Sequence, residues 1–280
     1  MHSRKRLQDD LEFVGEFSAL FEVMQQVAVS QLRQAQEQSA GRVSLIELMR
    51  REVLPGVPEA CRAHPLLRGG PAGRLIVVFT SDQGFVGPLH SGVIREARRL
   101  DGPQSRWLLV GQRGARMLSR SVGADEVLSM PSEETMERAM QRLGERILAR
   151  YLRERLREVW MVAPRFLSAT HQDVVTLQVL PLPVGSKQGE ADEGVLLEPS
   201  APRALEALAS AWLACACVET CWSARQAEFA ARAMHVEESR QGLAKQAQAI
   251  HYEWFKTMHA RMDVLVRETC VVQREMARRG

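Results

Sequence analysis

The stretch LIVVFTSDQGFVGPLHSGVI, residues 75–94, decides how the fold of this chain is interpreted. An apolar run ends in Thr-Ser-Asp, passes through two glycines three positions apart, and enters a segment with helical periodicity. A strand, a tight turn and a helix in this order are typical of α/β proteins, in which such turns can bind phosphate groups. The first question is therefore whether this turn belongs to a nucleotide-binding enzyme.

The turn has few of the residues that phosphate-binding loops use. A dinucleotide-binding loop has three glycines in the pattern G-x-G-x-x-G, and a P-loop ends in Gly-Lys followed by Ser or Thr. Here Gly84 and Gly87 are present and no lysine follows. A second run, LVGQRGARML at 109–118, also has two glycines. We interpret these glycines as residues that permit unusual backbone angles in tight connections, with weak anion binding as the alternative.

Other reactive side chains form no recognised catalytic or metal-binding motif. Ser81 and Asp82 lack the G-x-S-x-G surroundings of a nucleophile, and we expect the Asp82 carboxylate to cap the turn. Cys215, Cys217 and Cys221 fall in a helical segment, where buried cysteines pack as small apolar side chains, and metal binding is the less favoured alternative. The seven histidines have no ligand spacing. The sequence therefore predicts no active site, no metal and no cofactor.

The bulk composition excludes several classes of protein. The 280 residues carry a formal net charge of +3, and the arginines are dispersed, which does not favour nucleic acid binding. Acidic residues follow the basic N-terminus where a secretory signal needs an apolar segment, and no window has 18 uninterrupted apolar residues. Five cysteines are an odd number, so we expect reduced thiols in a cytoplasmic setting.

The N-terminal part of the chain has the periodicity of a long helix. Residues 1–54 contain no proline, and apolar residues recur every three or four positions from Phe13 to Leu32. We expect a helix over about residues 5–40 that resumes after Gly41 and ends before Pro55.

The C-terminal part is similar and longer. Residues 203–279 contain no proline, and Gly242 is their only glycine. A continuous helix of this length would extend roughly 115 Å at 1.5 Å per residue, too far to pack around a core of this size. Its apolar stripe needs a partner, and the N-terminal helix is the obvious one. We therefore predict that the two ends of the chain form an antiparallel coiled coil.

The middle of the chain alternates between β-rich and helical segments. The β-rich runs are 75–79, 106–111, 158–163 and 174–184, with helical patterns between them at 90–100, 114–120 and 132–156. Alternation of this kind predicts a parallel sheet covered by helices. The polar stretch 185–194 is expected to be a loop or hairpin tip. The predicted fold class is α/β, with a long antiparallel coiled coil of terminal helices, 1–55 and 203–280, and an inserted Rossmann-like parallel-sheet domain, 72–200.

Several strings resemble those of F-type ATP synthase gamma subunits. MQQVAVSQLRQAQ at 24–36 is similar to that family's M-x-M-V-A-A-S-K-L-R-x-A-Q, and TSDQGFVGPL at 80–89 is similar to T-S-D-R-G-L-C-G-G-L. LPLP at 180–183, LEPSAP at 197–202 and EFAARAM at 228–234 resemble further family segments. The strings occur in the family's order and cover nearly the whole chain.

This resemblance implies a rotor in place of an enzyme. In that family the paired terminal helices enter a ring of three alpha and three beta subunits, and the α/β body contacts the epsilon subunit and the membrane ring of c subunits. Catalysis belongs to alpha and beta, and rotation couples ion flow through the c ring to ATP synthesis or hydrolysis. The resemblance thus implies a peripheral protein on the cytoplasmic face of a prokaryotic membrane.

The resemblance also implies which residues matter. The TSDQG turn becomes a structural signature of the family, formed by Ser81, Asp82, Gly84 and Gly87. Contacts with the ring are implied for residues along the shaft, namely Met24, Val27, Ser30, Arg33, Arg232, Trp254, Met258, His259 and Asp263.

The chain departs from the family at polar positions. Two lysines of the family's N-terminal helix are replaced by Ala19 and Glu22, and an Arg-Gln pair that meets the beta subunit is replaced by Met258 and His259. The departures resemble the gamma subunits of alternate, second-copy rotary ATPases, which pump Na⁺ or H⁺.

Two other classes of protein stay open on the sequence alone. One is an α/β nucleotide-binding enzyme with helical extensions, which a bound cofactor or measured turnover would favour. The other is a free-standing coiled-coil adaptor, which a stable homodimer without alpha or beta partners would favour.

Overall fold

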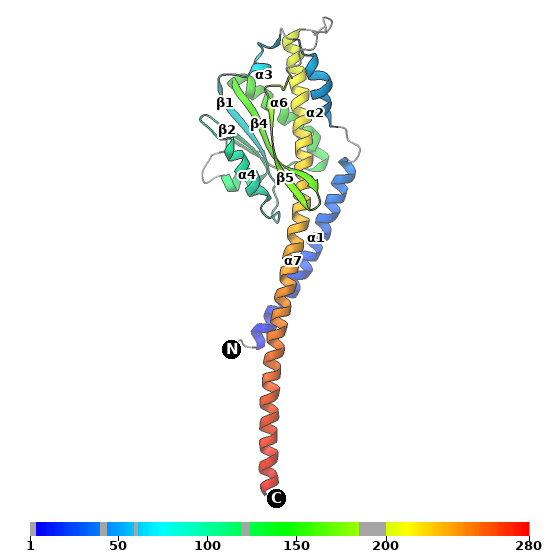
Figure 1. The fold of residues 1–280 in the computed structure, drawn as a ribbon, viewed down its shortest axis with the longest axis vertical. Coiled ribbons are helices and arrows are strands. Elements are labelled where there is room, and N and C mark those ends of the chain that lie inside the picture. Colours follow the sequence, from blue (N-terminus) through cyan, green and yellow to red (C-terminus); the bar gives the residue numbers. More distant parts are fainter. Residues whose placement is uncertain (1–3, 40–43, 59–60, 119–123, 185–199, 280) are drawn as a thin grey trace. The chain divides into compact units, whose positions relative to one another are not determined.

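The computed structural model describes residues 4–39, 44–58, 61–118, 124–184 and 200–279. Contacts divide the chain into two compact units, which we call the body unit, Ala28–Met234, and the shaft unit, Met1–Val27 with His235–Gly280. The two longest helices, α1 (Arg4–Ser39) and α7 (Ala201–Arg279), each contribute to both units (Figure 1). The long terminal helices predicted from the sequence are therefore confirmed. The predicted three-domain division, 1–55, 72–200 and 203–280, stays a prediction.

The body unit contains a five-stranded sheet in the order β3-β2-β1-β4-β5. Its strands are β1 (Ala72–Phe79), β2 (Arg106–Val110), β3 (Glu126–Leu128), β4 (Leu156–Ser168) and β5 (His171–Leu180). The first four pair in parallel, which confirms the predicted parallel sheet for that part. The sequence analysis missed β3, which has only three residues.

The last strand corrects the prediction of a wholly parallel sheet. β5 pairs antiparallel with β4. Two residues, 169 and 170, separate the strands, and so short a connection permits a hairpin but no crossover to a parallel strand. The predicted loop at 185–194 lies outside the described residues.

Helices cover both faces of the sheet. Along β1, alternate side chains enter different clusters, because successive residues of a strand point to opposite faces. Ile76 and Val78 pack with α4 (Leu89–Arg99) and α5 (Gln112–Leu118). Leu75, Val77 and Phe79 pack with α6 (Met136–Glu154) and the first part of α7.

The first part of α7 belongs to the core of the body unit. Trp212, Leu213 and Cys217 are fully buried, and the Trp212 indole donates a hydrogen bond to the Val179 carbonyl (2.9 Å). By length and composition alone α7 would qualify as a membrane span, with a window of mean hydropathy 1.4. Packing against the sheet provides a sufficient reason for these apolar residues.

The N-terminal helix resumes after the first break, as the sequence predicts. Ser44 caps α2 (Leu45–Leu48) by accepting a hydrogen bond from the Glu47 amide. A short π-helix, Met49–Val53, and a 3₁₀ turn, Leu54–Gly56, follow. A short helix α3, Pro65–Arg68, precedes β1.

The two long helices run antiparallel within each unit. In the shaft unit Gln25 hydrogen-bonds Glu237 and Glu22 lies near Arg240, so the partner number rises as the α1 number falls. In the body unit the side chain of Gln226 donates to the Ala35 carbonyl (3.1 Å), and Leu32 and Ala35 pack with Phe229 and Ala230. The predicted antiparallel coiled coil is confirmed.

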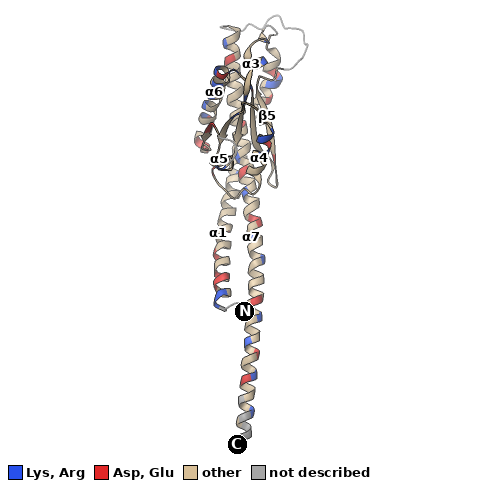
Figure 2. Cartoon of the chain, turned by 90° about the vertical axis from the view of Figure 1, so that its left-hand side faces the viewer, with Lys and Arg blue, Asp and Glu red and all other residues tan. Residues whose placement is uncertain are grey.

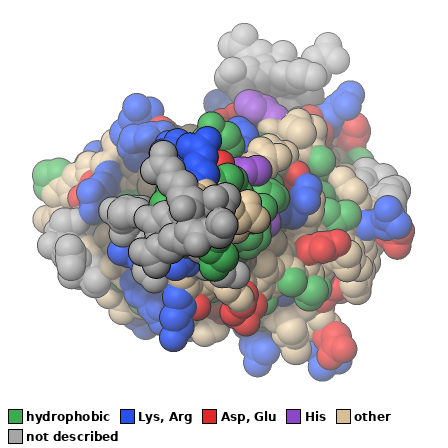
Figure 3. Space-filling model, turned by 90° about the horizontal axis from the view of Figure 1, so that it is seen from below, with side chains coloured by type: hydrophobic (Ala, Val, Ile, Leu, Met, Phe, Trp, Pro, Cys, Tyr) green, Lys and Arg blue, Asp and Glu red, His purple; other side chains and the backbone are tan. Residues whose placement is uncertain are grey.

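The end of α7 presents apolar side chains without a helix opposite it among the described residues, because α1 begins at Arg4. Its exposed apolar side chains are Phe255, Met262, Leu265, Val266, Val271 and Met276. Basic and acidic side chains are interspersed along α7, whereas acidic residues predominate along α1 after the basic residues at its start (Figure 2). Basic, acidic and hydrophobic side chains are likewise interspersed on the face shown in Figure 3.

Candidate functional site: the joint between sheet and shaft helix

The glycines of the second run pack against the end of β1. Thr80 lies at that end, and its hydroxyl contacts the carbonyls of Val110 (3.2 Å) and Gly111 (3.1 Å) and accepts from the Gly114 amide (3.1 Å). A Cβ on Gly111 or Gly114 would lie within 2.6 Å of this hydroxyl oxygen. Close packing therefore explains why glycine occupies these positions, as the structural interpretation predicts.

Asp82 is a helix cap, but it caps a helix distant in sequence. Its carboxylate accepts hydrogen bonds from the amides of Gln112 (2.7 Å), at the start of α5, and Met130 (3.0 Å). The sequence analysis expected a cap of the local turn, and the structure corrects the position. The Asp82 carboxylate thus joins its own turn to two other segments of the body unit, the start of α5 and the segment that contains Met130.

The signature turn also provides a surface for α7. Gly87 has a φ of 55° and Phe85 a φ of 61°, so the turn contains two left-handed residues, one on each side of Val86. The carbonyl of Gly84 accepts a hydrogen bond from the guanidinium of Arg232 (3.3 Å). A Cβ on Gly84 would lie 3.0 Å from the guanidinium of Arg113. The turn thus makes room for arginines from two helices.

Four buried polar residues meet where this turn contacts α7. Ser81, His90, Glu228 and Arg232 are each at most 6% exposed, and we call them the polar joint. Glu228 and Arg232 form an ion pair one helical turn apart. Both guanidinium groups of Arg225 and Arg232 lie over the Phe229 ring, 5.6 and 5.8 Å from its centroid.

Ser81 is hydrogen-bonded to His90. The Ser81 hydroxyl donates to the Gln83 carbonyl (2.8 Å), and its oxygen lies 2.9 Å from Nε2 of His90. Nδ1 of His90 is buried and has no hydrogen-bond partner among the described residues. A second proton on this ring would therefore find no acceptor.

Burial shifts the pKa values of the titratable side chains in the polar joint. It lowers the pKa of His90, and the positive charges of Arg113 and Arg232 lower it further. Burial raises the pKa of Glu228, and this rise is opposed by the charge of Arg232. His90 is thus neutral at neutral pH beside a paired carboxylate.

The joint has the residue types of a hydrolase triad without its arrangement. Ser81 is 1% exposed, so no substrate can reach its hydroxyl. The hydrogen bond to His90 is present, but the Glu228 carboxylate bonds Arg232 and not the histidine. A catalytic triad needs an accessible nucleophile and a carboxylate that orients the histidine. The joint is suited to holding helix α7 against the sheet.

Two further sets of hydrogen bonds attach α7 to the body unit at other positions along the helix. The Glu219 carboxylate accepts from the Ser44 hydroxyl (2.7 Å) and the Ile46 amide (2.9 Å), at the start of α2. Gln226 bonds the Ala35 carbonyl of α1. Together with Arg232, these residues attach α7 to three different segments along more than three helical turns.

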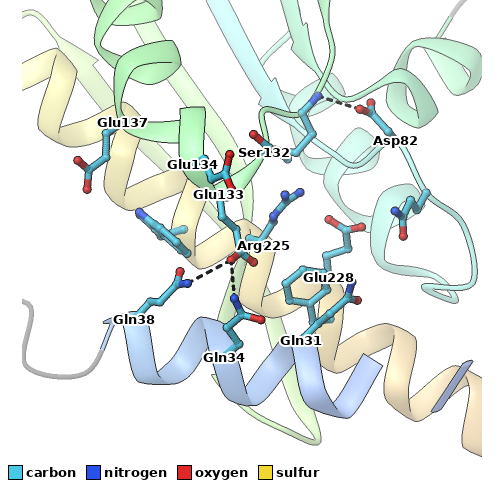
Figure 4. Close-up of a pocket in the computed structure, with 14 residues that line it drawn as sticks. Gln31, Gln34, Gln38, Asp82, Ser132, Glu133, Glu134, Glu137, Arg225 and Glu228 are labelled. Carbon is cyan, nitrogen blue, oxygen red and sulfur yellow. Dashed lines mark hydrogen bonds between the residues drawn. The ribbon is translucent and has the colours of Figure 1, made fainter. Parts of the chain in front are cut away.

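A cavity of about 1010 Å³ lies beside the joint in the body unit (Figure 4). The C-terminal part of α1 contributes three glutamines, of which Gln34 and Gln38 donate to the Glu133 carboxylate (3.3 and 3.2 Å). The segment before α6 and helix α7 form the other walls, the latter with Arg225 and Glu228. The sequence analysis missed this cavity, although the spacing of Gln31, Gln34 and Gln38 on one helical face could have indicated it.

The residues for which the resemblance implies ring contacts differ in the exposure of their side chains. Val27, Ser30, Arg33, His259 and Asp263 are exposed, and Met24, Trp254 and Met258 are half-buried. Arg232 is 5% exposed and belongs to the polar joint, so its side chain faces inward. The signature residues Ser81, Asp82, Gly84 and Gly87 are brought together with it.

Three cysteines in the first part of α7 pack in or against the core of the body unit. Cys217 and Cys221 are buried, the Cys221 sulfur lies 3.5 Å from the Met130 sulfur, and Cys215 is half-buried. Burial raises the pKa of Cys221 to about 12, which keeps it a thiol. The described residues contain no group of three His, Cys, Asp or Glu that could hold a metal ion.

Paired antiparallel terminal helices, joined through buried contacts to an inserted α/β sheet, define a class of shaft proteins with an attached body. A family model described as ATP synthase matches residues 3–253. The ATP synthase gamma chain of Gluconobacter oxydans is 28% identical over 235 residues, 74% of this chain and 79% of that protein. That of Gemmatimonas aurantiaca is 30% identical over 203 residues, 66% of this chain and 68% of that protein.

Solved structures share the fold. A chain of the Euglena gracilis mitochondrial ATP synthase, in its OSCP/F1/c-ring structure, matches with a TM-score of 0.74 and 15% identity, covering 98% of this chain and 94% of that chain. A rotor chain of the same enzyme matches with a TM-score of 0.71 and 15% identity, covering 92% and 98% of the two chains.

This chain belongs to the ATP synthase gamma family. Members of that family are rotor subunits without a catalytic site of their own. The membership answers the question raised by the TSDQG turn, because the family is one of non-catalytic rotor subunits and not of nucleotide-binding enzymes.

Proposed function

We propose that this chain is the central-stalk rotor of an F-type ATP synthase or ATPase. Its paired helices turn inside a ring of three alpha and three beta subunits, and its body contacts the epsilon subunit and the c ring. The chain transmits torque between ion flow in the c ring and catalysis in the ring of alpha and beta subunits.

The observation that carries this proposal is the attachment of α7 to the body. Glu219, Gln226 and Arg232 bond three different segments, so a torque on the sheet reaches the helix through several contacts at once. A buried ion pair is specific in geometry, and removing one partner is costly, which suits a joint that must not slip.

The free end of α7 supports the same function. Its exposed apolar side chains need a partner to cover them, and the inner surface of a ring would provide one. We infer that the half-buried Met258 and the exposed His259 and Asp263 on α7 contact the ring, as does the exposed side of α1 with Val27, Ser30 and Arg33. Met24 and Trp254 then support these contacts from partly buried positions.

The chain is peripheral to a membrane through its complex. We place it on the cytoplasmic face of a prokaryotic membrane, because the curated relatives are bacterial gamma chains. The replacements at Ala19, Glu22, Met258 and His259 support a second-copy rotary ATPase, because they remove or change charged and polar groups that the more typical gamma subunits carry.

The experiment is a gentle affinity purification of the tagged chain from native membranes, followed by quantitative mass spectrometry. We expect alpha- and beta-type subunits at about three copies each per copy of this chain, with epsilon and c subunits. The untagged strain is the control. A homodimer free of these subunits would instead support a coiled-coil adaptor.

A further inference from the structure

The cavity beside the joint has an uneven charge. Its lining includes one cation, Arg225, and five carboxylates, which are Asp82, Glu133, Glu134, Glu137 and Glu228. All these residues belong to the body unit, and Figure 4 shows them around one space between α1, α7 and the segment that leads into α6. An anionic ligand would be repelled from such a site.

Several of these charges are already used inside the chain. Both oxygens of Asp82 accept backbone amides, and Glu133 accepts from Gln34 and Gln38. Arg225 donates to the Pro131 carbonyl (3.1 Å). Groups that can bind a ligand must therefore be sought among the other residues of the lining.

Glu228 is the residue that points to a ligand. Its side chain is 5% exposed, and one oxygen pairs with Arg232. The other oxygen, Oε2, is buried and has no hydrogen-bond partner among the described residues, although Glu228 lines the cavity. The Ser81 hydroxyl also lies near this carboxylate, but it donates to the Gln83 carbonyl (2.8 Å). A buried carboxylate oxygen is normally hydrogen-bonded, so Oε2 is left for a donor that enters the cavity.

The lining identifies the chemistry of that donor. Glu228 Oε2 and the exposed Glu134 carboxylate accept hydrogen bonds, and the wall of the cavity also contains the aromatic ring of Trp222. The described residues contain no set of three ligands for a metal ion. A guanidinium or ammonium group carries only donors and a positive charge, so it matches these walls.

We propose that this cavity receives the side chain of a lysine or arginine carried by a peptide segment of another subunit of the same complex. The proposal rests on the proposed function, since it requires a multi-subunit assembly. The inserted cation bonds Glu228 Oε2 and lies near Glu134. Because the walls come from α1, α7 and the start of α6, the occupant would bind all three segments next to the polar joint.

The test uses charge variants in the reassembled complex. Purified complex from which this chain has been removed is titrated with wild-type chain, Glu134→Gln or Glu134→Lys, at low and high salt. Glu145, exposed on helix α6, which follows the turn that carries Glu134, lies outside the cavity and supplies the controls Glu145→Gln and Glu145→Lys. We expect Glu134→Lys to weaken assembly about tenfold or more at low salt and less at high salt, with Glu134→Gln intermediate.

A second readout identifies the occupant. A photo-cross-linking residue in place of Glu134, in the intact complex, should join a partner peptide with a lysine or arginine next to the linked position. The proposal is overturned if Glu134→Lys assembles as Glu145→Lys does, or if the linked peptide lacks a basic residue. It is also overturned if the cavity in the assembled complex holds ordered water or a free polyamine alone. Failure of the wild-type chain to assemble would contradict the proposed function instead.

Discussion

At the residue scale, the polar joint decides how firmly the long helix is attached to the sheet. Glu228 and Arg232 are both about 95% buried, and Arg232 also bonds the carbonyl of Gly84. Two buried charges are tolerated because each neutralises the other and because the turn provides an acceptor. The joint therefore depends on both partners.

Replacing Arg232 by Met should lower the free energy of unfolding by about 3–5 kcal/mol, because Glu228 would keep a buried and unpaired charge. The double variant Glu228→Gln with Arg232→Met should lose less free energy of unfolding than Arg232→Met alone, since it leaves no buried charge without a partner. Urea unfolding at neutral pH measures both. Equal losses in the single and double variants would contradict the pairing.

His90 should make the body unit sensitive to acid. Folding lowers the pKa of His90 below its ordinary value of 6.5, so the folded state favours the neutral ring. The stability that depends on a neutral ring is fully present above pH 6.5 and is lost as the pH falls through and below that value. The nearby charges are Arg113 on α5 with Glu228 and Arg232 on α7.

The substitution His90→Gln isolates this contribution. Unfolding midpoints measured between pH 5 and 7 should fall with acid in the wild type and fall less in the variant. The raised pKa of Glu228 acts in the opposite direction in both proteins, so their difference reports on His90. Parallel pH profiles would show that His90 does not titrate in the expected way.

At the element scale, the two long helices contain glycines that packing does not require. A Cβ added at Gly15 or Gly242 would meet no atom within 4 Å, in contrast to Gly114, whose Cβ would clash with Thr80. Glycine in a helix interior loses more conformational entropy on folding than alanine does. These positions therefore soften the shaft helices locally.

Replacing Gly242 by Ala should stabilise α7 by about 1 kcal/mol. Hydrogen exchange of the amides around residue 242 should slow, and the change should not spread to the sheet. Gly114→Ala is the contrasting variant, which should destabilise the chain through its contact with Thr80. A loss of stability in Gly242→Ala would contradict the absence of a close neighbour there.

At the scale of the whole molecule, coupling requires that α7 remain one continuous helix over Ala201–Arg279. Met262 is 59% exposed, so its side chain is not needed for packing within the chain. Its backbone, however, belongs to a helix of 79 residues. A break there would separate the joint from the end that we assign to the ring.

Proline in place of Met262 should kink α7 at a local cost of about 3 kcal/mol. We expect the complex to assemble but to lose ATP-driven ion pumping, measured in membrane vesicles. Met262→Ala removes the side chain and keeps the helix, so it should pump normally. Unchanged pumping in the proline variant would contradict the proposed role of this segment in coupling.

The sequence by itself determined the elements and their kind. Periodicity over residues 5–40 and 203–279 specified the two long helices, because helical spacing of apolar residues is a local property. Alternation in the middle specified the parallel part of the sheet, and the missing phosphate-loop residues around Gly84 gave no support to a nucleotide site. Ordered resemblances along the chain indicated the family.

Only the tertiary structure decided what the signature residues do. Asp82 caps a helix 30 residues later, and Thr80 packs on Gly111 and Gly114, because adjacent parallel strands bring their carboxyl ends together. Arg232 was assigned to the shaft by resemblance, yet it faces Gly84, about 150 positions earlier in the chain. Such pairings arise from packing between distant segments, so no local pattern in the sequence could specify them.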